Sequence, residues 1–326
     1  MLGAASGSPQ PTLTMMAFVL RRLLWLAPVL FSVALVTFLL MHAVPGGPWD
    51  SSERPVSDTL ARQLDAKYGL DEPLWRQFLT FGGNALQGDL GVSFQQQGRS
   101  VSGIIADGLA VTAVLGLFAL TFAVVVGVSL GVLAALRPNS FLDYLSVTFA
   151  TVGASTPSFV LGILLIVVFA VQLQWLPVFG WEQKWWLFPD PRQAILPTIT
   201  LGTLPAAYLA RVTRAAVIEV LQEDYVRTAA AKGLRERVIL FRHVARNAMI
   251  PILTVAGPLA ANLVTGSFIV ETVFGIPGIG KQFITSVLQR DYGMIMGVTI
   301  FYAAVIAVAN LTVDLMYAVV DPRIRR

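Results

Sequence analysis

The chain has 326 residues, of which 56% are hydrophobic and only 13% are charged, and its formal net charge is +4. A soluble domain of this length carries roughly a quarter charged residues, so this chain has too little polar surface to cover one large soluble core. The charged residues are also unevenly spread, and their spacing indicates a protein that crosses a membrane several times.

Six long windows contain no Asp, Glu, Lys or Arg. Their charged borders are Arg22 and Asp50, Asp107 and Arg137, Asp143 and Glu182, Arg192 and Arg211, Arg246 and Glu271, and Asp291 and Asp314. A helix needs about 20 apolar residues to cross the hydrocarbon core of a bilayer. The fourth window is slightly short, but snorkelling of Arg211 and Arg214 extends it. The sequence therefore predicts six spans, over residues 17–44, 109–136, 144–172, 195–215, 248–272 and 294–319.

The first 16 residues are predicted to be a disordered leader, because they are uncharged, rich in small residues and contain proline. Arg21 and Arg22 followed by an apolar run could also begin a signal peptide. However, the run is longer than the roughly 15 residues of a signal-peptide core. It is therefore predicted to be an uncleaved first span.

The longest polar segment follows the first span and covers residues 45–106. Its apolar residues have partial helical spacing, at Leu60, Leu64 and Tyr68 and again at Leu74 and Phe78. Such spacing predicts short amphipathic helices, here on the external face of the membrane.

Lys and Arg are concentrated in alternate segments between the predicted spans. With the N-terminus in the cytoplasm, the cytoplasmic segments hold most of them, including a cluster between Arg211 and Arg246. Because orientation follows this bias, both termini are predicted to be cytoplasmic, with residues 320–326 as a tail. The basic character is thus a topology signal, and no nucleic-acid partner is expected. On the external side, an interfacial aromatic belt or a substrate entrance is predicted from Trp175, Trp181, Trp185 and Trp186.

Between the fourth and fifth spans lies the charged segment EDYVRTAAAKGLRERVILFRHVARNAMIP, residues 223–251. Asp224 is a candidate N-cap, Tyr225–Lys232 a short helix, and Gly233 a left-handed C-terminal cap. A second helix is predicted to begin at Arg235 and to continue into the fifth span. The segment is therefore predicted to be a charged helix–turn–helix on the cytoplasmic side.

This segment resembles the cytoplasmic coupling motif of ABC-importer permeases, whose pattern is Glu-Ala-Ala, three residues, Gly, and then Ile-x-Leu-Pro. The chain has Arg227-Thr228-Ala229, three residues, Gly233, and later Ile250-Pro251. The Arg and Thr in place of Glu and Ala are similar to the oligopeptide, dipeptide and nickel branch, where RTAxAKG is common. Residues 70–94 and 271–325 are similar to the B-type permeases of this branch, so the resemblance covers nearly the whole chain from Arg21 onward.

The resemblance implies an all-α membrane protein with six transmembrane helices, the type I ABC-importer permease fold, and an external insertion after the first span. The permease core would cover residues 107–319, with cytoplasmic coupling helices at 223–246. The implied function is ATP-driven peptide uptake in a bacterial or archaeal plasma (inner) membrane, with no catalysis by this chain. Implied partners are a second homologous permease subunit, two cytoplasmic ATPase subunits or domains, an external substrate-binding protein and membrane lipid. This chain would bind no cofactor, since ATP and Mg²⁺ would lie on the partner subunits.

The resemblance also implies that the first cytoplasmic helix docks in a groove of an ATPase subunit. The residues carried over are Asp224, Arg227, Thr228, Ala229, Ala230, Lys232, Gly233 and Leu234. Three successive alanines, from Ala229 to Ala231, would let this helix approach a partner closely. The basic residues around it, including Arg235 and Arg237, could pair with carboxylates of the partner. The alternative is an ordinary basic loop that satisfies the orientation bias of Lys and Arg.

A second stretch, Gly275–Gln282, almost matches the phosphate-binding loop G-x-x-x-x-G-K-[ST]. The match fails because Gln282 replaces the residue whose hydroxyl binds Mg²⁺, no strand is predicted before it, and the topology places it outside the cell. A tight external turn that leads into a short helix is predicted instead. Candidates for a gate contact or a structural role are Gly275, Pro277, Gly278 and Gly280.

Asp314 lies within the last predicted span, where a carboxylate is costly and is a functional candidate. Pairing with Arg323 or Arg325 is favoured over ion coupling, because Asp314 is near a helix end. An ion-coupled secondary transporter or channel is the alternative function, and such carriers generally need ionisable groups at membrane depth. No catalytic or metal site is predicted, since the chain has no Cys and its two His, His42 and His243, are far apart.

Overall fold

A computed structural model describes residues 15–49, 57–96, 98–185, 188–264 and 266–320, and the structural statements below refer to these ranges. The elements in chain order are α1 (Met15–Ala43), α2 (Asp58–Tyr68), α3 (Leu74–Leu86), α4 (Val101–Leu136), α5 (Phe141–Ser155), α6 (Ser158–Leu165) with a π-helical extension (Ile166–Gln172), β1 (Gln183–Trp185), β2 (Phe188–Pro189), α7 (Pro191–Leu221), α8 (Asp224–Ala231), α9 (Glu236–Val238) with a π-helical extension (Ile239–Val244), α10 (Ala245–Val264), α11 (Phe268–Val273), α12 (Ile279–Leu288) and α13 (Tyr292–Val320). The two short strands pair antiparallel. The predicted all-α fold is confirmed.

Five helices of the described chain are long and apolar enough to cross a membrane: α1, α4, α7, α10 with its preceding turn, and α13. The helical pair Phe141–Ser155 and Ser158–Gln172 makes a sixth span if it is counted as one, but the pair is bent by 109°. The predicted span over 144–172 is therefore broken in its middle and is not one straight helix. Pro157 explains the break, because proline lacks an N–H and disfavours helical backbone at the residue before it. Thr156 is accordingly extended, with φ −89° and ψ 121°.

The fifth span also ends earlier than the predicted residue 272. Helix α10 ends at Val264, and Gly266 has a φ of +78°, which is the left-handed region that favours glycine. A separate short helix, α11, begins at Phe268, where the Ser267 hydroxyl oxygen accepts a hydrogen bond from the Val270 N–H at 3.3 Å. Residues 268–273 therefore belong to the loop region that follows α10.

The predicted leader covered residues 1–16, but α1 already includes Met15 and Met16. The rest of that leader, residues 1–14, lies outside the described chain, as does the predicted tail after Val320. In the polar segment after α1, α2 and α3 confirm the two predicted short helices.

Helices α4 and α7 form the centre of the bundle, and small residues allow them to pack closely. A Cβ atom added at Gly127 would lie 2.6 Å from the Ala206 carbonyl oxygen, and one added at Gly131 would lie 2.6 Å from that of Ala210. Helix α5 is tied to α7 by an ion pair in which the Arg214 Nε lies 2.7 Å from Asp143 Oδ1. Asp143 is buried, so this pair is part of the bundle's internal structure.

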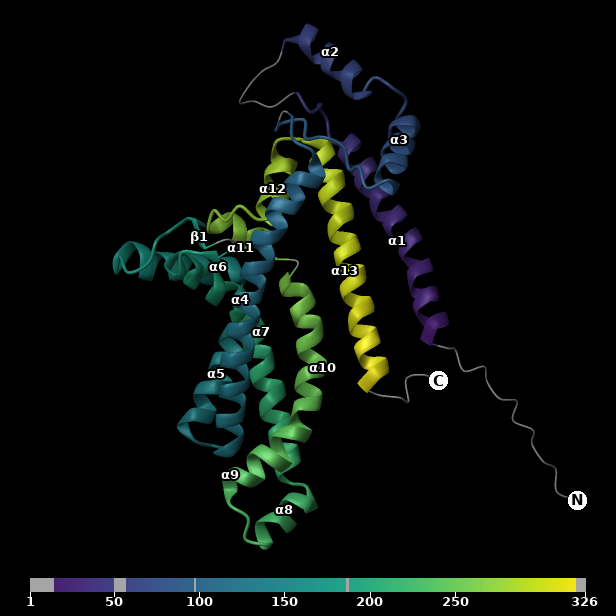
Figure 1. The fold of residues 1–326 in the computed structure, drawn as a ribbon. Coiled ribbons are helices and arrows are strands. Elements are labelled where there is room, and N and C mark those ends of the chain that lie inside the picture. The colour runs from purple at the N-terminus through teal and green to yellow at the C-terminus, as the bar shows by residue number, and fades with distance from the viewer. Residues whose placement is uncertain (1–14, 50–56, 97, 186–187, 265, 321–326) are drawn as a thin grey trace, which may run out of the picture.

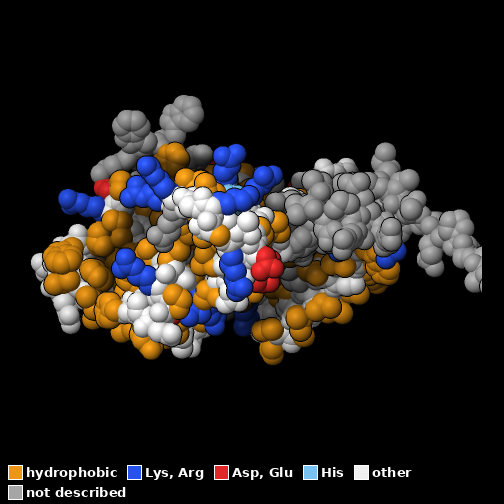
Figure 2. Space-filling view, turned by 90° about the horizontal axis from the view of Figure 1, so that it is seen from below, with side chains coloured by type: hydrophobic (Ala, Val, Ile, Leu, Met, Phe, Trp, Pro, Cys, Tyr) orange, Lys and Arg blue, Asp and Glu red, His pale blue; other side chains and the backbone are white. Residues whose placement is uncertain are grey.

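The two ends of the bundle differ in what they carry (Figure 1). Helices α2, α3, α11 and α12 gather at one end, and α8 and α9 lie at the other, toward which α1 begins and α13 ends. Viewed from the α8–α9 side, the surface carries many Lys and Arg side chains and few Asp or Glu (Figure 2). We name the α8–α9 end cytoplasmic and the opposite end external because the Lys and Arg bias predicts that orientation, which itself stays a prediction.

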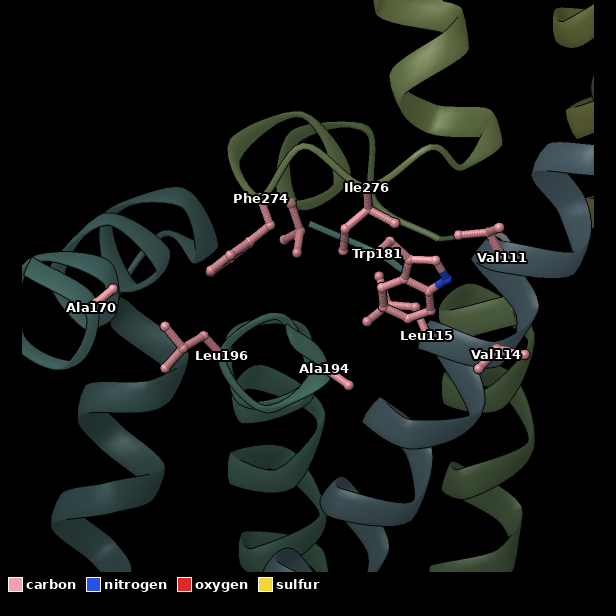
Figure 3. Packing of buried hydrophobic residues seen from close by; sticks show 10 residues of the cluster. Val111, Val114, Leu115, Ala170, Trp181, Ala194, Leu196, Phe274 and Ile276 are labelled. Carbon is pink, nitrogen blue, oxygen red and sulfur yellow. The ribbon is translucent and has the colours of Figure 1, made fainter. Parts of the chain in front are cut away.

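A hydrophobic cluster closes the external end of the α4–α7 core. It includes Leu115 of α4, Leu196 of α7 and Phe274 after α11, all no more than 2% exposed (Figure 3). Trp181 is buried in the same cluster, so it is not part of a surface aromatic belt. Trp175 is 64% exposed, as a belt residue would be, whereas the Trp185 and Trp186 side chains lie outside the described part of the chain.

Candidate functional site

The cytoplasmic turn between α7 and α10 has the predicted helix–turn–helix form. Helix α8 begins at Asp224, but Glu223 occupies the N-cap position and makes no side-chain capping hydrogen bond, so the prediction of Asp224 as N-cap is wrong. At the other end, Gly233 has a φ of +76°, which confirms the predicted left-handed residue. Its N–H donates to the Ala230 carbonyl at 2.9 Å, and this contact ends the helix.

One face of α8 is fixed to the bundle. Val226 and Ala229 are each 6% exposed and pack in a cluster with residues of α4, α7 and α10, including Val217 and Ala248. The Asn247 side-chain amide also donates to the Tyr225 hydroxyl at 2.6 Å. Ala229 therefore faces this chain's own core, which corrects the expectation that it would approach a partner.

The opposite face of α8 is exposed and includes the other predicted coupling residues: Asp224, Arg227, Thr228, Ala230, Lys232, Gly233 and Leu234. The Arg227 guanidinium lies 4.0 Å from the Asp224 carboxylate, and these side chains are 70% and 100% exposed. Such an exposed pair contributes little to stability. The charged side chains on this face therefore contribute little to the stability of the fold.

Three apolar side chains extend this exposed face beyond the turn. Leu234 is 42% exposed, Val238 is 39% exposed and Phe241 is 81% exposed. Leu234 lies in the turn before the second helix, Val238 lies at the end of α9, and Phe241 lies in its π-helical extension. Val238 and Phe241 were missed by the sequence prediction, although apolar residues at helical spacing within a basic segment are a readable signal. We call the exposed face of α8 together with Leu234, Val238 and Phe241 the cytoplasmic docking surface.

The glycine-rich turn at the external end encloses a carboxylate that the sequence did not single out. Glu271 of α11 is fully buried. The Thr112 hydroxyl of α4 donates to Glu271 Oε1 at 2.9 Å, and the Lys281 N–H donates to Oε2 at 3.1 Å. Thr112 Oγ1 in turn accepts from the Ile279 N–H at 3.0 Å. These contacts join α4, α11 and the start of α12.

Glycine is required where the chain surrounds this carboxylate. A Cβ atom at Gly280 would lie 2.9 Å from Glu271 Oε2, and one at Gly278 would lie even closer to that atom. Gly266 is equally close on the other side, since its Cβ would lie 2.6 Å from Oε1. Gly275 has a φ of +67°, which allows the tight turn before α12. The predicted turn and short helix are thus confirmed, whereas their external placement and a role as a gate contact stay predictions.

The environment of Glu271 changes its titration. Burial raises the pKa of this carboxyl to about 7, while the hydrogen bonds from Thr112 and from the N–H groups of Lys281 and Gly280 act in the opposite direction. The first N–H groups of a helix are a ready anion site. In this chain that site is filled by the protein's own carboxylate, which gives a physical reason why the loop resembles a phosphate-binding loop without being one.

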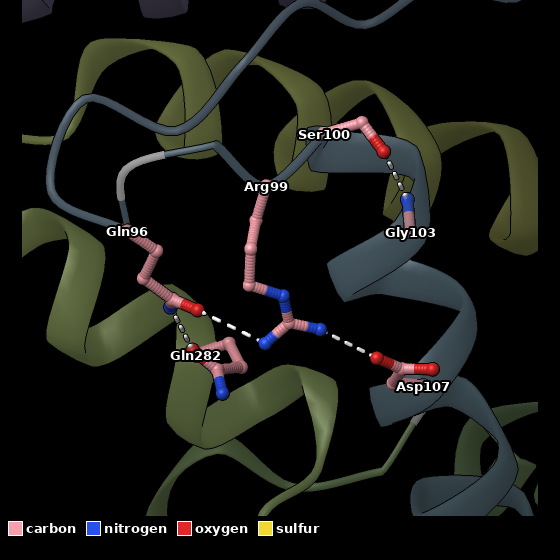
Figure 4. Close-up of polar contacts among 6 residues, drawn as sticks. All are labelled: Gln96, Arg99, Ser100, Gly103, Asp107 and Gln282. Atoms are coloured by element: carbon pink, nitrogen blue, oxygen red, sulfur yellow. Dashed lines mark hydrogen bonds and ion pairs between the residues drawn. The ribbon is translucent and has the colours of Figure 1, made fainter.

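Polar contacts also fasten the segment before α4 to α12 (Figure 4). Gln282, the residue that departs from the phosphate-loop pattern, accepts a hydrogen bond from the Gln96 amide at 3.1 Å. Arg99 pairs with Asp107 at 2.5 Å, and the Ser100 hydroxyl oxygen accepts from the Gly103 N–H and caps α4. The Gln96–Gln282 contact joins segments that are 186 residues apart, whereas the other two contacts order the start of α4 locally.

A second buried carboxylate at the external end, Asp291, lies at the start of α13. It accepts hydrogen bonds from the Ser93 hydroxyl, from the Phe94 N–H at 3.1 Å and from the Met294 N–H at 3.2 Å. It thus caps α13 and holds the chain before α4. Asp314 lies in the same helix, but its side chain is outside the described part of the structure, so its proposed pairing stays a prediction.

A largely helical chain with at least five helices that are long and apolar enough to cross a membrane has the architecture of a multi-pass membrane protein. Residues 127–326 match the family described as "Binding-protein-dependent transport system inner membrane component", and residues 15–116 match its N-terminal companion, "Binding-prot-dependent transport system membrane comp, N-term". The chain belongs to this family of inner-membrane transport permeases.

Curated relatives match along nearly the whole chain. The chain is 40% identical over 311 residues to the dipeptide transport system permease protein DppB of Bacillus subtilis, covering 95% of this chain and 98% of the relative. It is also 40% identical to the oligopeptide transport system permease protein OppB of Salmonella typhimurium, covering 95% of this chain and all of the relative. A crystal structure of an amino acid ABC transporter with histidines is similar in fold alone, with a TM-score of 0.50, 18% identity, and coverage of 66% of this chain and 93% of that chain.

Proposed function

We propose that the chain is a membrane-spanning permease subunit of an ATP-driven importer of peptides. The support for a peptide substrate is the pair of relatives that are permeases of dipeptide and oligopeptide transport systems and that align over 95% of the chain. The chain would form the translocation path with a second, related permease. An external binding protein would deliver the substrate, and the external end, with residues 45–106 as an insertion, would receive it.

The cytoplasmic docking surface is the observation that carries this proposal. Helix α8 is anchored by Val226 and Ala229, so a force on its outer face is transmitted to α7 and α10. Its outer face carries uncommitted basic residues, which can pair with carboxylates of an ATPase subunit. Phe241, 81% exposed, adds an aromatic anchor of the kind that dominates binding energy at interfaces.

In this proposal the chemistry lies on the partners. ATP and Mg²⁺ bind to two cytoplasmic ATPase subunits or domains, and this chain binds no cofactor and catalyses no reaction. Both termini lie in the cytoplasm of a bacterium or archaeon, and lipid contacts the exposed apolar side chains of α1, such as Leu40 at 64% exposure. Residues 107–319 are the permease core, with the coupling helices at 223–246.

Reconstitution tests the proposal directly. Proteoliposomes that contain the two permeases and the ATPase subunits are supplied with binding protein and a radiolabelled dipeptide or oligopeptide. ATP is expected to drive uptake, and a proton or sodium gradient alone is not. Gradient-driven uptake by permeases without any ATPase would instead establish the alternative, an ion-coupled secondary transporter or channel.

A further inference from the structure

Helix α7 presents an exposed face from its middle toward its cytoplasmic end. Leu204 is 52% exposed and Tyr208 is 45% exposed, and Arg211 and Ala215 are exposed as well. Their spacing of four, three and four residues places all four on one side of the helix. The opposite side packs against α4 through Ala206 and Ala210, so the exposed face points away from the α4–α7 contact.

The same face of α7 is covered in its external half. Pro197 lies two turns from Leu204 toward the external end and is buried, and Leu201 packs against the external hydrophobic cluster. Helix α6 contributes to this cover: a Cβ atom at Gly162 would lie 3.2 Å from Thr200 Cγ2 and 3.3 Å from a ring carbon of Phe274. The face is thus closed toward the outside and open toward the cytoplasm.

A charged side chain stands on the open part. Arg214, one turn closer to the cytoplasm, is paired with Asp143, whereas Arg211 forms no ion pair within the described part of the chain. Three residues along a helix place Arg211 about 4.5 Å deeper than Arg214. An ionised group at membrane depth usually faces a water-filled path or a protein partner and not hydrocarbon.

We propose that the face formed by Leu204, Tyr208, Arg211 and Ala215 lines the inner half of the translocation path, and that Arg211 binds the C-terminal carboxylate of the peptide. The inference rests on the proposed function and extends it to a contact with the substrate. A guanidinium forms two parallel charge-assisted hydrogen bonds with a carboxylate. The Tyr208 hydroxyl, one turn away, supplies a further donor.

The composition of the face fits substrates of varied sequence. Every linear peptide has one C-terminal carboxylate, whatever its side chains are. One cation therefore provides a contact common to all of them, while the apolar Leu204 and the small Ala215 impose no charge requirement. Two other placements of the face compete with this one: toward lipid, with Arg211 snorkelling to a headgroup, or against the second permease.

Thiol labelling distinguishes these placements, because the chain contains no cysteine. The variant Tyr208→Cys is assembled with its partner subunits in inside-out membrane vesicles without ATP. It is treated with methanethiosulfonate reagents that carry a sulfonate or a trimethylammonium group. We expect labelling by both, with the sulfonate reagent about tenfold faster because Arg211 attracts it. Leu40→Cys, on the exposed face of α1, is the lipid-facing control and is expected to remain unlabelled.

Substitutions of Arg211 test whether this residue causes the charge preference of the labelling. Adding Arg211→Gln to Tyr208→Cys is expected to bring the two labelling rates to about the same value, whereas Arg211→Lys keeps the preference. Arg192→Gln, the same substitution at the external end of α7, is the matched control and should also keep it. Failure of both reagents to label Tyr208→Cys would overturn the assignment to the path. Labelling without a charge preference would overturn the anion contact.

Protection by substrate tests the carboxylate itself. Dialanine at millimolar concentration is expected to slow the labelling of Tyr208→Cys several-fold, and dialanine amide is expected not to. Equal slowing by both, or by neither, would contradict carboxylate binding by Arg211. ATP-dependent peptide release from wild-type inside-out vesicles that were loaded with binding protein and peptide is measured in parallel, so failure of this inference is distinguishable from failure of the proposed function.

Discussion

The external and cytoplasmic ends of the molecule differ in whether their ionisable side chains are buried and hydrogen-bonded or exposed. At the external end, the Glu271 carboxylate is fully buried and accepts hydrogen bonds from Thr112 and Lys281 of the same chain. At the cytoplasmic end, Arg227 is 70% exposed and has only a long contact with Asp224. A buried carboxyl whose oxygens accept hydrogen bonds from the same chain joins its elements together, whereas an exposed charge that holds no element in place is available to a partner.

The glycines at the two ends repeat this contrast. Gly266, Gly278 and Gly280 are crowded by the Glu271 carboxylate, so any side chain there must displace it. Gly233 has a φ of +76°, and a Cβ atom added to it would meet nothing within 4 Å, so a side chain there strains only the backbone. Substitutions at the external end should therefore affect stability first, and substitutions at the cytoplasmic end should affect coupling first.

The largest expected effect is that of Glu271→Ala. Removing the carboxylate leaves the Thr112 hydroxyl and the Lys281 N–H buried without their acceptor, which costs about 3 kcal/mol of folding free energy. The change is measured as a lower unfolding midpoint of the purified complex. Glu271→Gln is the matched control, because its amide oxygen still accepts one of these bonds, and it should lose less than half as much. A wild-type midpoint in Glu271→Ala would show that the external contacts do not hold this end together.

The pH dependence of stability sharpens the same point. Burial raises the pKa of Glu271 from 4.5 to about 7, so between these values the folded protein holds a proton that the unfolded chain has lost. This contribution to stability is complete below about pH 4.5 and is lost as the pH rises through about 7. Glu271→Gln does not titrate. As the pH is raised from 5 to 8, the unfolding midpoint of the wild type should therefore fall relative to that of Glu271→Gln. A constant difference between the two midpoints over this range would contradict a buried carboxyl at this site.

A charge satisfied inside the chain should be structural at the cytoplasmic end too. Asp143→Ala leaves the Arg214 guanidinium without the carboxylate that lies 2.7 Å away. Because Arg214 is 32% exposed, water replaces part of the lost contact, and the expected cost is about 2 kcal/mol. The measurement is again the unfolding midpoint. Arg227→Ala on the docking surface is the comparison and should lose much less stability. An equal loss in the two variants would contradict the distinction between the buried ion pair that stabilises the fold and the exposed charges that do not.

The smallest effect on stability, with a large effect on transport, is expected for Gly233→Val. A β-branched residue in the left-handed region costs about 1 kcal/mol and distorts the turn that presents α8 and Leu234. Peptide uptake per ATP hydrolysed should fall, while the variant still inserts into the membrane. Gly69→Val is the matched control, since Gly69 ends α2 with a φ of +69° and also has nothing within 4 Å. Equal uptake by the two variants would remove the special role of the cytoplasmic turn.

Features that depend on local sequence could be predicted, and those that depend on distant contacts could not. Charge-free windows define the spans because a charge is costly in hydrocarbon at any position of the fold. Gly233 was predictable because a helix followed by glycine ends in the left-handed region by local geometry. The break between α5 and α6 had a local signal at Thr156-Pro157, but proline is also tolerated within spanning helices, so the signal was ambiguous.

The partners of Glu271 could not be predicted in the same way. Thr112 is 159 residues away in the sequence, and the other donor is a backbone N–H with no side-chain signature. The orientation of Ala229 also depends on the fold, because α8 turns its Val226 and Ala229 face toward the ends of α4 and α7. The exposed residues Val238 and Phe241 complete the docking surface only once that orientation is known.

Burial of Phe241 on assembly is the most direct test of the claim that the cytoplasmic docking surface receives the ATPase. Phe241→Cys is labelled with a membrane-impermeant maleimide in inside-out vesicles, first with the permeases alone and then with the ATPase subunits added. Leu86→Cys is the control: this residue is 92% exposed at the external end and is labelled from the opposite side of the membrane. ATPase subunits are predicted to slow labelling of Phe241→Cys at least about tenfold and to leave Leu86→Cys unchanged. Unaltered labelling of Phe241→Cys in an importer that still transports peptide would contradict the account.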